Sequence, residues 1–176
     1  MRDQAQVADP SITEPVEHNR LSDFERRVLV YSTTGFDDLT LFEAQMARYV
    51  RDKEIKKDST VFLMTLDKPD DTPLILNWCR ANGYHYAVWL PNWKDVDVEG
   101  AIVKTNSFGP YNALAKAWRD RDVSEAANEG ISFYDGVSPN TFDMNERMNE
   151  LKNSLRIVLV HIDKKEDSHG RQSKSS

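Results

Sequence analysis

Cysteine is almost absent from this chain, because Cys79 is the only one among 176 residues. A disulfide framework within the chain is therefore excluded, and a reducing compartment is the natural setting. Cys79 lies inside a segment with helical periodicity, where a buried core position is favoured over a catalytic thiol.

Long apolar runs are lacking as well. No stretch approaches the length of a membrane-spanning helix. The N-terminal sequence MRDQAQVADPSITEP does not have the basic and then apolar order of a signal peptide. These absences predict a soluble, cytoplasmic protein without a membrane partner.

Positive charge is in deficit, with 23 Lys and Arg against 29 Asp and Glu, a net charge of -6 and a pI near 5.2. Such a chain gives no strong signal for nucleic-acid binding. An anionic ligand has to be held locally, by backbone N–H groups or a few placed cations. The histidines, at 18, 85, 161 and 169, are scattered, so we expect neither a metal site nor a cofactor.

Polar segments at the two ends enclose one domain. Residues 1–24 and 163–176 lack hydrophobic periodicity and are expected to be disordered, which leaves residues 25–162 as the folded domain. Five short β-rich runs are predicted strands: 27–32, 59–64, 84–90, 131–135 and 156–162. The continuous apolar character of VLVY, VFLM and IVLV is typical of parallel strands that are buried on both faces.

Segments of helical period separate these strands. Predicted helices begin near Asp37 or Asp38, near Thr72, within 110–128 and after Thr141; Gly83 ends the second. Strand followed by helix, four times over, predicts an α/β three-layer sandwich with a mostly parallel sheet of about five strands. Ligands of such folds bind at the carboxyl ends of the strands, so we expect function in the strand-to-helix loops 31–38, 65–73, 89–112 and 134–143.

The last of these loops, YDGVSPNTFD, carries the strongest chemistry. Gly136 permits a sharp turn, Ser138 and Thr141 offer hydroxyls, and the N–H groups of residues 140–143 are free donors at a helix start. A phosphate fits such a loop. Ser138 or Thr141 serving only as a helix cap is the other interpretation, and the pattern leaves both open.

The third loop is about twenty residues long and rich in aromatic side chains. Trp93, Tyr111 and Asn112 form a set suited to stacking on a ring and bonding its edge. A tryptophan that merely covers the sheet edge is the alternative. The sequence does not choose between the two.

The order of these landmarks resembles the SLOG superfamily, and within it the small YspA-like bacterial and phage domains. The resemblance spans residues 27–162 and includes Ser32–Asp38, Gly109-Pro110-Tyr111-Asn112, and Phe133-x-Asp135-Gly136-x-Ser138-Pro139-Asn140-Thr141. It implies a Rossmann-like fold that binds a nucleotide or nucleotide-derived ligand.

The resemblance assigns two sets of site residues. The ligand- or phosphate-binding set is Thr33, Thr34, Asn112, Asp135, Gly136, Ser138, Asn140 and Thr141; the set that contacts the base or sugar is Trp93 and Tyr111.

Several positions depart from the family pattern. Asn140 replaces the second glycine of the last loop, Tyr111 stands where an arginine would face the phosphate, and residues 66–72 replace a glycine-rich loop. Met144 occupies the position of the catalytic glutamate in the LOG-type hydrolases of this family. These departures disfavour hydrolase activity of that type and indicate a less charged ligand or a degraded pocket.

Three functions follow as hypotheses. The first is a sensor or binding protein for a nucleotide, a nucleotide-sugar or an ADP-ribose-like ligand. The second is an N-glycosidase or deoxyribosyltransferase in which Asp135, Asp143 or Glu146 supplies the carboxylate. The third is a phage or mobile-element factor that binds a host protein through an exposed apolar patch. Pairing of two copies through helices is also expected.

Overall fold

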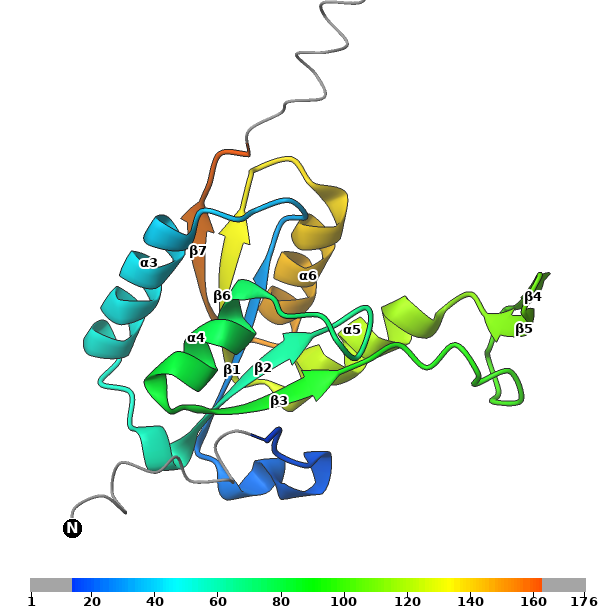
Figure 1. The fold of residues 1–176 in the computed structure, drawn as a ribbon, viewed down its shortest axis with the longest axis horizontal. Coiled ribbons are helices and arrows are strands. Elements are labelled where there is room, and N and C mark those ends of the chain that lie inside the picture. The colour runs from blue at the N-terminus through cyan, green and yellow to red at the C-terminus, as the bar shows by residue number, and fades with distance from the viewer. Residues whose placement is uncertain (1–13, 163–176) are drawn as a thin grey trace, which may run out of the picture.

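Five parallel strands form one sheet at the centre of residues 14–162, the part of the chain that the computed structural model describes (Figure 1). Its order is β3-β2-β1-β6-β7. The bounds are β1 Arg26–Ser32, β2 Thr60–Thr65, β3 His85–Trp89, β6 Glu129–Tyr134 and β7 Ser154–Leu159. In register, Leu29 of β1 faces Leu63 of β2 and Val30 of β1 faces Ile131 of β6. The predicted α/β fold is confirmed, and all five strands of the sheet run parallel.

Helices cover both faces of this sheet. On one face lie α3 (Leu39–Asp52) and α4 (Leu74–Asn82); on the other lie α5 (Ala115–Ala126) and α6 (Pro139–Glu150). Alternation along β1 divides the core: Val28 and Val30 pack with α3 and α4, whereas Leu29 packs with residues of α5 and α6. The three-layer architecture follows from this double-sided burial.

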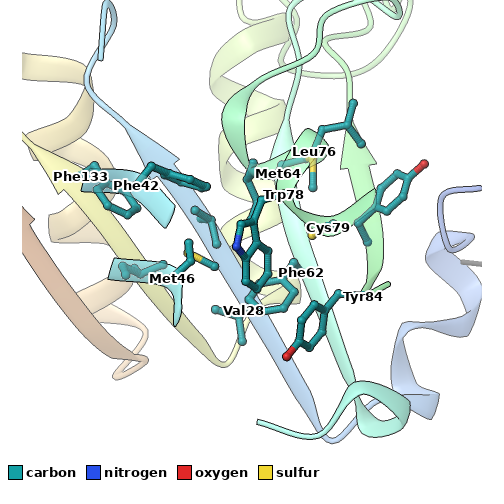
Figure 2. Close-up of a cluster of buried hydrophobic side chains, with 14 of the residues drawn as sticks. Val28, Phe42, Met46, Phe62, Met64, Leu76, Trp78, Cys79, Tyr84 and Phe133 are labelled. Carbon is teal, nitrogen blue, oxygen red and sulfur yellow. The ribbon is translucent and has the colours of Figure 1, made fainter. Parts of the chain in front are cut away.

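Aromatic side chains dominate the core beneath α3 and α4 (Figure 2). Trp78 of α4 meets the ring of Phe62 edge-on at 5.4 Å and stacks on Tyr84 at 5.0 Å, as measured between ring centroids. Cys79 lies in the same cluster and is completely buried, and its burial raises the pKa of the thiol. The core interpretation of Cys79 is thereby confirmed.

Local chemistry sets the ends of the helices. The Asp38 side chain accepts a hydrogen bond from the Leu41 N–H and so caps α3, which begins at Leu39, close to the predicted start near Asp37 or Asp38. The helix expected near Thr72 begins two residues later, at Leu74. Gly83 ends it in the left-handed conformation, with φ 73°.

The segment before β1 differs from the expectation of disorder. A 3-10 helix, η1, spans His18–Asp23, although the sequence placed these residues in the disordered part. The Val16 N–H donates to the Tyr86 carbonyl of β3, and the His18 ring stacks on Trp89 at 4.0 Å. Buried Leu21 and Phe24 anchor this segment, which covers the β3 edge of the sheet. The tails 1–13 and 163–176 lie outside the described residues.

The long third loop contains an arm that the sequence pattern did not reveal. Strands β4 (Val103–Asn106) and β5 (Gly109–Asn112) pair antiparallel as a hairpin that projects away from the sheet (Figure 1). A short 3-10 helix, η2 (Lys57–Ser59), precedes β2. Strand β7 starts and ends a few residues earlier in the sequence than predicted. Within residues 14–162, no helix has the length and apolar character required to cross a membrane.

Candidate functional site

A cavity of about 750 Å³ lies at the carboxyl ends of β1 and β2, bordered by α5 and α6. Its walls combine strand ends, the loop after β2 and two helices. The lining residues are Tyr31, Ser32, Thr34, Thr65, Leu66, Asp67, Asp71, Thr72, Pro73, Lys116, Ala117, Arg119, Asp120, Asn140, Thr141, Asp143, Met144 and Arg147. This edge of the sheet is where open parallel α/β folds hold their ligands.

Thr33 joins three segments beside the cavity. Its N–H donates to the Phe133 carbonyl, and its hydroxyl oxygen accepts from the Asp135 N–H. The same oxygen lies 3.3 Å from the hydroxyl of Thr141 in α6. Because Thr33 and Thr141 are both buried, they fix the cavity wall, whereas exposed Thr34 lines the cavity itself.

The loop after β6 satisfies its donors internally. The Asp135 carboxylate accepts from the N–H groups of Val137 and Ser138 at 3.0 and 2.8 Å, and from the Ser138 hydroxyl at 2.7 Å. Ser138 therefore does not cap α6 with its side chain. Gly136, with φ 88°, allows the turn, but Asp135, Gly136 and Ser138 are not among the residues that line the cavity. A phosphate on this loop would have to compete with the Asp135 carboxylate.

These contacts stabilise the ionised form of Asp135. Donation from the Val137 N–H, together with the N–H and hydroxyl of Ser138, lowers the pKa of Asp135 from 3.8 to about 2. A lowered carboxyl pKa means that the contribution to stability is complete above pH 4 and is lost as the pH falls through 2.

Asp135→Asn is expected to lower Tm at pH 7, because an amide oxygen accepts the two N–H bonds without a charge and an amide nitrogen cannot accept from the Ser138 hydroxyl. Thermal unfolding of both proteins between pH 7 and pH 2 measures the effect. The difference in Tm should shrink between pH 4 and pH 2, where the wild-type carboxylate becomes protonated. A difference that is constant over this range contradicts the assignment.

The first turn of α6 faces the cavity with free donors. Asn140 and Thr141 line the cavity, and within residues 14–162 their backbone N–H groups have no acceptor. Two turns along, Arg147 lines the same cavity, and its side chain makes no hydrogen bond or ion pair within the described part of the chain. The site therefore offers donors and an unpaired cation along one side of α6.

Two further cations come from α5, and both are engaged. Arg119 donates to the Leu66 carbonyl and to Asp67 at 2.9 Å, and it also pairs with Asp120. Lys116 lies 3.5 Å from Asp67. The Arg119 guanidinium holds the pKa of Asp67 below its usual value. This cluster fixes the loop after β2 against α5.

The sequence analysis missed Lys116, Arg119 and Arg147. The available signal was helical spacing: Lys116 and Arg119 are three residues apart, and Arg147 is three residues after Met144. The sequence analysis expected no arginine at the site, because Tyr111 stands where the SLOG pattern has the arginine that faces the phosphate. The structure supplies guanidinium groups from the bodies of α5 and α6 instead.

The residues proposed to contact the base lie elsewhere. Trp93, in the loop before the arm, meets Tyr111 of β5 edge-on at 6.1 Å between ring centroids, and neither residue lines the cavity. Asn112 is fully buried at the base of the arm, where its side-chain oxygen accepts from the N–H groups of Ile102 and Leu114. Asn112 is not among the residues that line the cavity. At the tip of the arm, the Phe108 side chain is 97% exposed.

The carboxylates considered for catalysis are not gathered at one point. Asp143 lines the cavity, whereas Asp135 and Glu146 do not. Met144, at the position of the family's glutamate, also lines it. Among residues 14–162, no group of three or more His, Cys, Asp or Glu side chains is arranged to hold a metal ion.

Comparisons of the chain with protein-family models, curated proteins and solved structures give no match. The SLOG resemblance therefore remains one of motif order and of an α/β fold with a five-stranded parallel sheet.

Proposed function

We propose that this protein binds a nucleotide or a nucleotide-derived ligand, such as a nucleotide-sugar or an ADP-ribose-like molecule, as a sensor or binding protein. The observation that carries the proposal is that the unpaired Arg147 and the free N–H groups of Asn140 and Thr141 line one cavity. A guanidinium and a helix N-terminus together favour an anionic group.

The size and position of the cavity support the proposal. About 750 Å³ is within the range of pockets that enclose a small organic ligand. The strand order reverses between β1 and β6, since β2 lies on one side of β1 and β6 on the other. The cavity adjoins this point, where open α/β sheets bind their ligands.

Charge balance limits the number of phosphates. Four aspartates and three cations line the cavity, and Lys116 and Arg119 are already bound to Asp67. Only Arg147 is left to neutralise a ligand. Aspartates repel a polyphosphate but accept hydrogen bonds from sugar hydroxyls, so a ligand with one or two phosphates and a sugar fits best.

Arg147→Glu is expected to reduce ligand-dependent stabilisation strongly. A charge-assisted hydrogen bond contributes about 1.5–3 kcal/mol, so its loss and the added repulsion weaken binding by tenfold or more. The measurement is the shift of Tm with AMP, ADP-ribose and a nucleotide-sugar, followed by calorimetric titration of any compound that responds.

Arg121→Glu is the matched control, because Arg121 is a solvent-exposed residue of α5 and does not line the cavity. It should keep the full ligand response. Wild-type protein that responds to no member of the panel contradicts the proposed function, and so does an unchanged response in Arg147→Glu.

A further inference from the structure

A second, smaller cavity of about 210 Å³ lies beside the first. The two cavities share Tyr31, Ser32, Thr65 and Pro73, which stand at the ends of β1 and β2 and at the start of α4. Space is thus available on both sides of the same strand ends, and the shared residues form the border between the two cavities.

The smaller cavity differs from the larger one in chemistry. Its remaining walls are all apolar and include Phe36, Phe42, Met64, Leu74 and Phe133. Most of these side chains belong to the core beneath α3 and α4, where Figure 2 shows Phe42, Met64 and Phe133. The charged walls of the larger cavity come instead from α5, α6 and the loop after β2. The two cavities therefore open from opposite faces of the sheet.

Hydrogen-bonding groups are scarce in the smaller cavity. The Tyr31 hydroxyl donates to Asn145 at 2.6 Å, and burial raises the pKa of Tyr31, so this phenol stays protonated and engaged. The remaining side-chain donors and acceptors in the wall are the hydroxyls of Ser32 and Thr65. The flat faces of a ring can pack against these apolar walls, whereas a polar ring edge finds only the hydroxyls of Ser32 and Thr65 as side-chain partners.

We infer that the smaller cavity is an apolar subsite, which takes an aromatic or aliphatic ring carried by the same ligand whose anionic group lies against Arg147. This inference rests on the proposed function and adds the class of ligand: an amphipathic anion that extends across the ends of β1 and β2. Phe36 stacks on Phe133 at 5.2 Å, so one wall of the subsite is an ordered aromatic surface.

The first test compares methyl phosphate with phenyl phosphate in calorimetric titrations of the full-length protein. The two probes carry the same anionic group and differ in the ring. Phenyl phosphate should bind about tenfold tighter or better, since burial of one ring removes on the order of 100 Å² of apolar surface from water. Equal affinity of the two probes overturns the subsite and leaves the proposed function standing.

A variant that fills the smaller cavity gives the second test. Leu74→Trp should remove the advantage of phenyl phosphate and leave methyl phosphate binding unchanged, because Leu74 lines only the smaller cavity. Leu39→Trp is the matched control, since Leu39 is half-exposed and lines neither cavity. A phenyl advantage that survives in Leu74→Trp overturns the inference.

A third test uses the wild-type protein and therefore does not depend on the folding of Leu74→Trp. Phenyl phosphate ring protons should show nuclear Overhauser contacts to the Met64 methyl group in the smaller cavity. Contacts to the methyl group of Met144, in the larger cavity, with none to Met64 contradict the subsite. If neither probe binds, the subsite is overturned, whereas the proposed function is decided separately by the response to AMP, ADP-ribose and the nucleotide-sugar.

Discussion

Replacing Glu129 with alanine is expected to lower the free energy of unfolding by about 3 kcal/mol. Glu129 begins β6 and is nearly buried. Arg26 donates to both of its carboxylate oxygens, at 3.1 and 3.0 Å, and the Tyr49 hydroxyl donates to the same carboxylate. Alanine leaves a guanidinium and a buried phenol without their acceptor.

The surrounding contacts explain why replacement of the Glu129 carboxylate is expected to destabilise the protein. Arg26 also donates to the Lys53 carbonyl, so Glu129 connects β1, β6 and the end of α3. Burial and the hydrogen bond to Glu129 raise the pKa of Tyr49, and the phenol therefore remains a donor. The Arg26 side chain is partly exposed, which keeps the expected cost at the lower end of the range for buried ion pairs.

Urea unfolding at pH 7 measures this effect, with Glu125→Ala as the control. Glu125 is an exposed residue of α5, and its replacement should change stability by about 0.5 kcal/mol or less. Glu129→Gln should have an intermediate effect, because the amide oxygen still accepts one hydrogen bond. A loss below about 1 kcal/mol in Glu129→Ala would show that the ion pair is dispensable.

The strands were predictable because parallel strands buried on both faces leave a continuous apolar run in the sequence. Residues 61–64 of β2 are all buried, and the run VFLM is visible without any structure. The position of the candidate site followed from the same fact, since the carboxyl ends of such strands meet at one edge. The fold class and the sheet edge at which a ligand site was expected therefore follow from hydrophobic patterning.

The side chains that line the site were harder to predict. Arg119 and Arg121 stand two residues apart in a polar helix that has no strong apolar stripe. Two residues correspond to about 200° of rotation, so only one of them can face the sheet. The structure leaves 9% of the Arg119 side chain exposed and 47% of that of Arg121. Nothing in the local sequence marks that difference.

The direction of the arm could not be predicted either. Loop length and aromatic content placed Trp93 and Tyr111 beside the ligand, because loops at this edge often bind ligands. A loop of about twenty residues has no sequence signal for where it points, and here it forms a hairpin that projects away from the sheet. The segment before β1 was predicted to be disordered because it lacks hydrophobic periodicity. Two buried side chains, Leu21 and Phe24, nevertheless suffice to anchor it.

Trp78→Ala is expected to destabilise the protein by about 3–5 kcal/mol, the largest effect among the substitutions considered. Trp78 is 8% exposed and packs between Phe62 and Tyr84 in the core beneath α3 and α4 (Figure 2). Alanine removes the indole from two aromatic contacts and leaves a cavity that the rigid sheet beneath it cannot fill.

Trp93→Ala provides the same chemical change at a position where packing is slight. Trp93 lies in the loop before the arm, is 38% exposed, and meets only the ring of Tyr111 among the aromatic rings of the described residues. Its loss should cost about 1 kcal/mol or less by urea unfolding. Ligand binding by Trp93→Ala should match that of the wild type, because Trp93 lines neither cavity. Equal losses of unfolding free energy in Trp78→Ala and Trp93→Ala would mean that the surroundings of Trp93 are as tightly packed as the core.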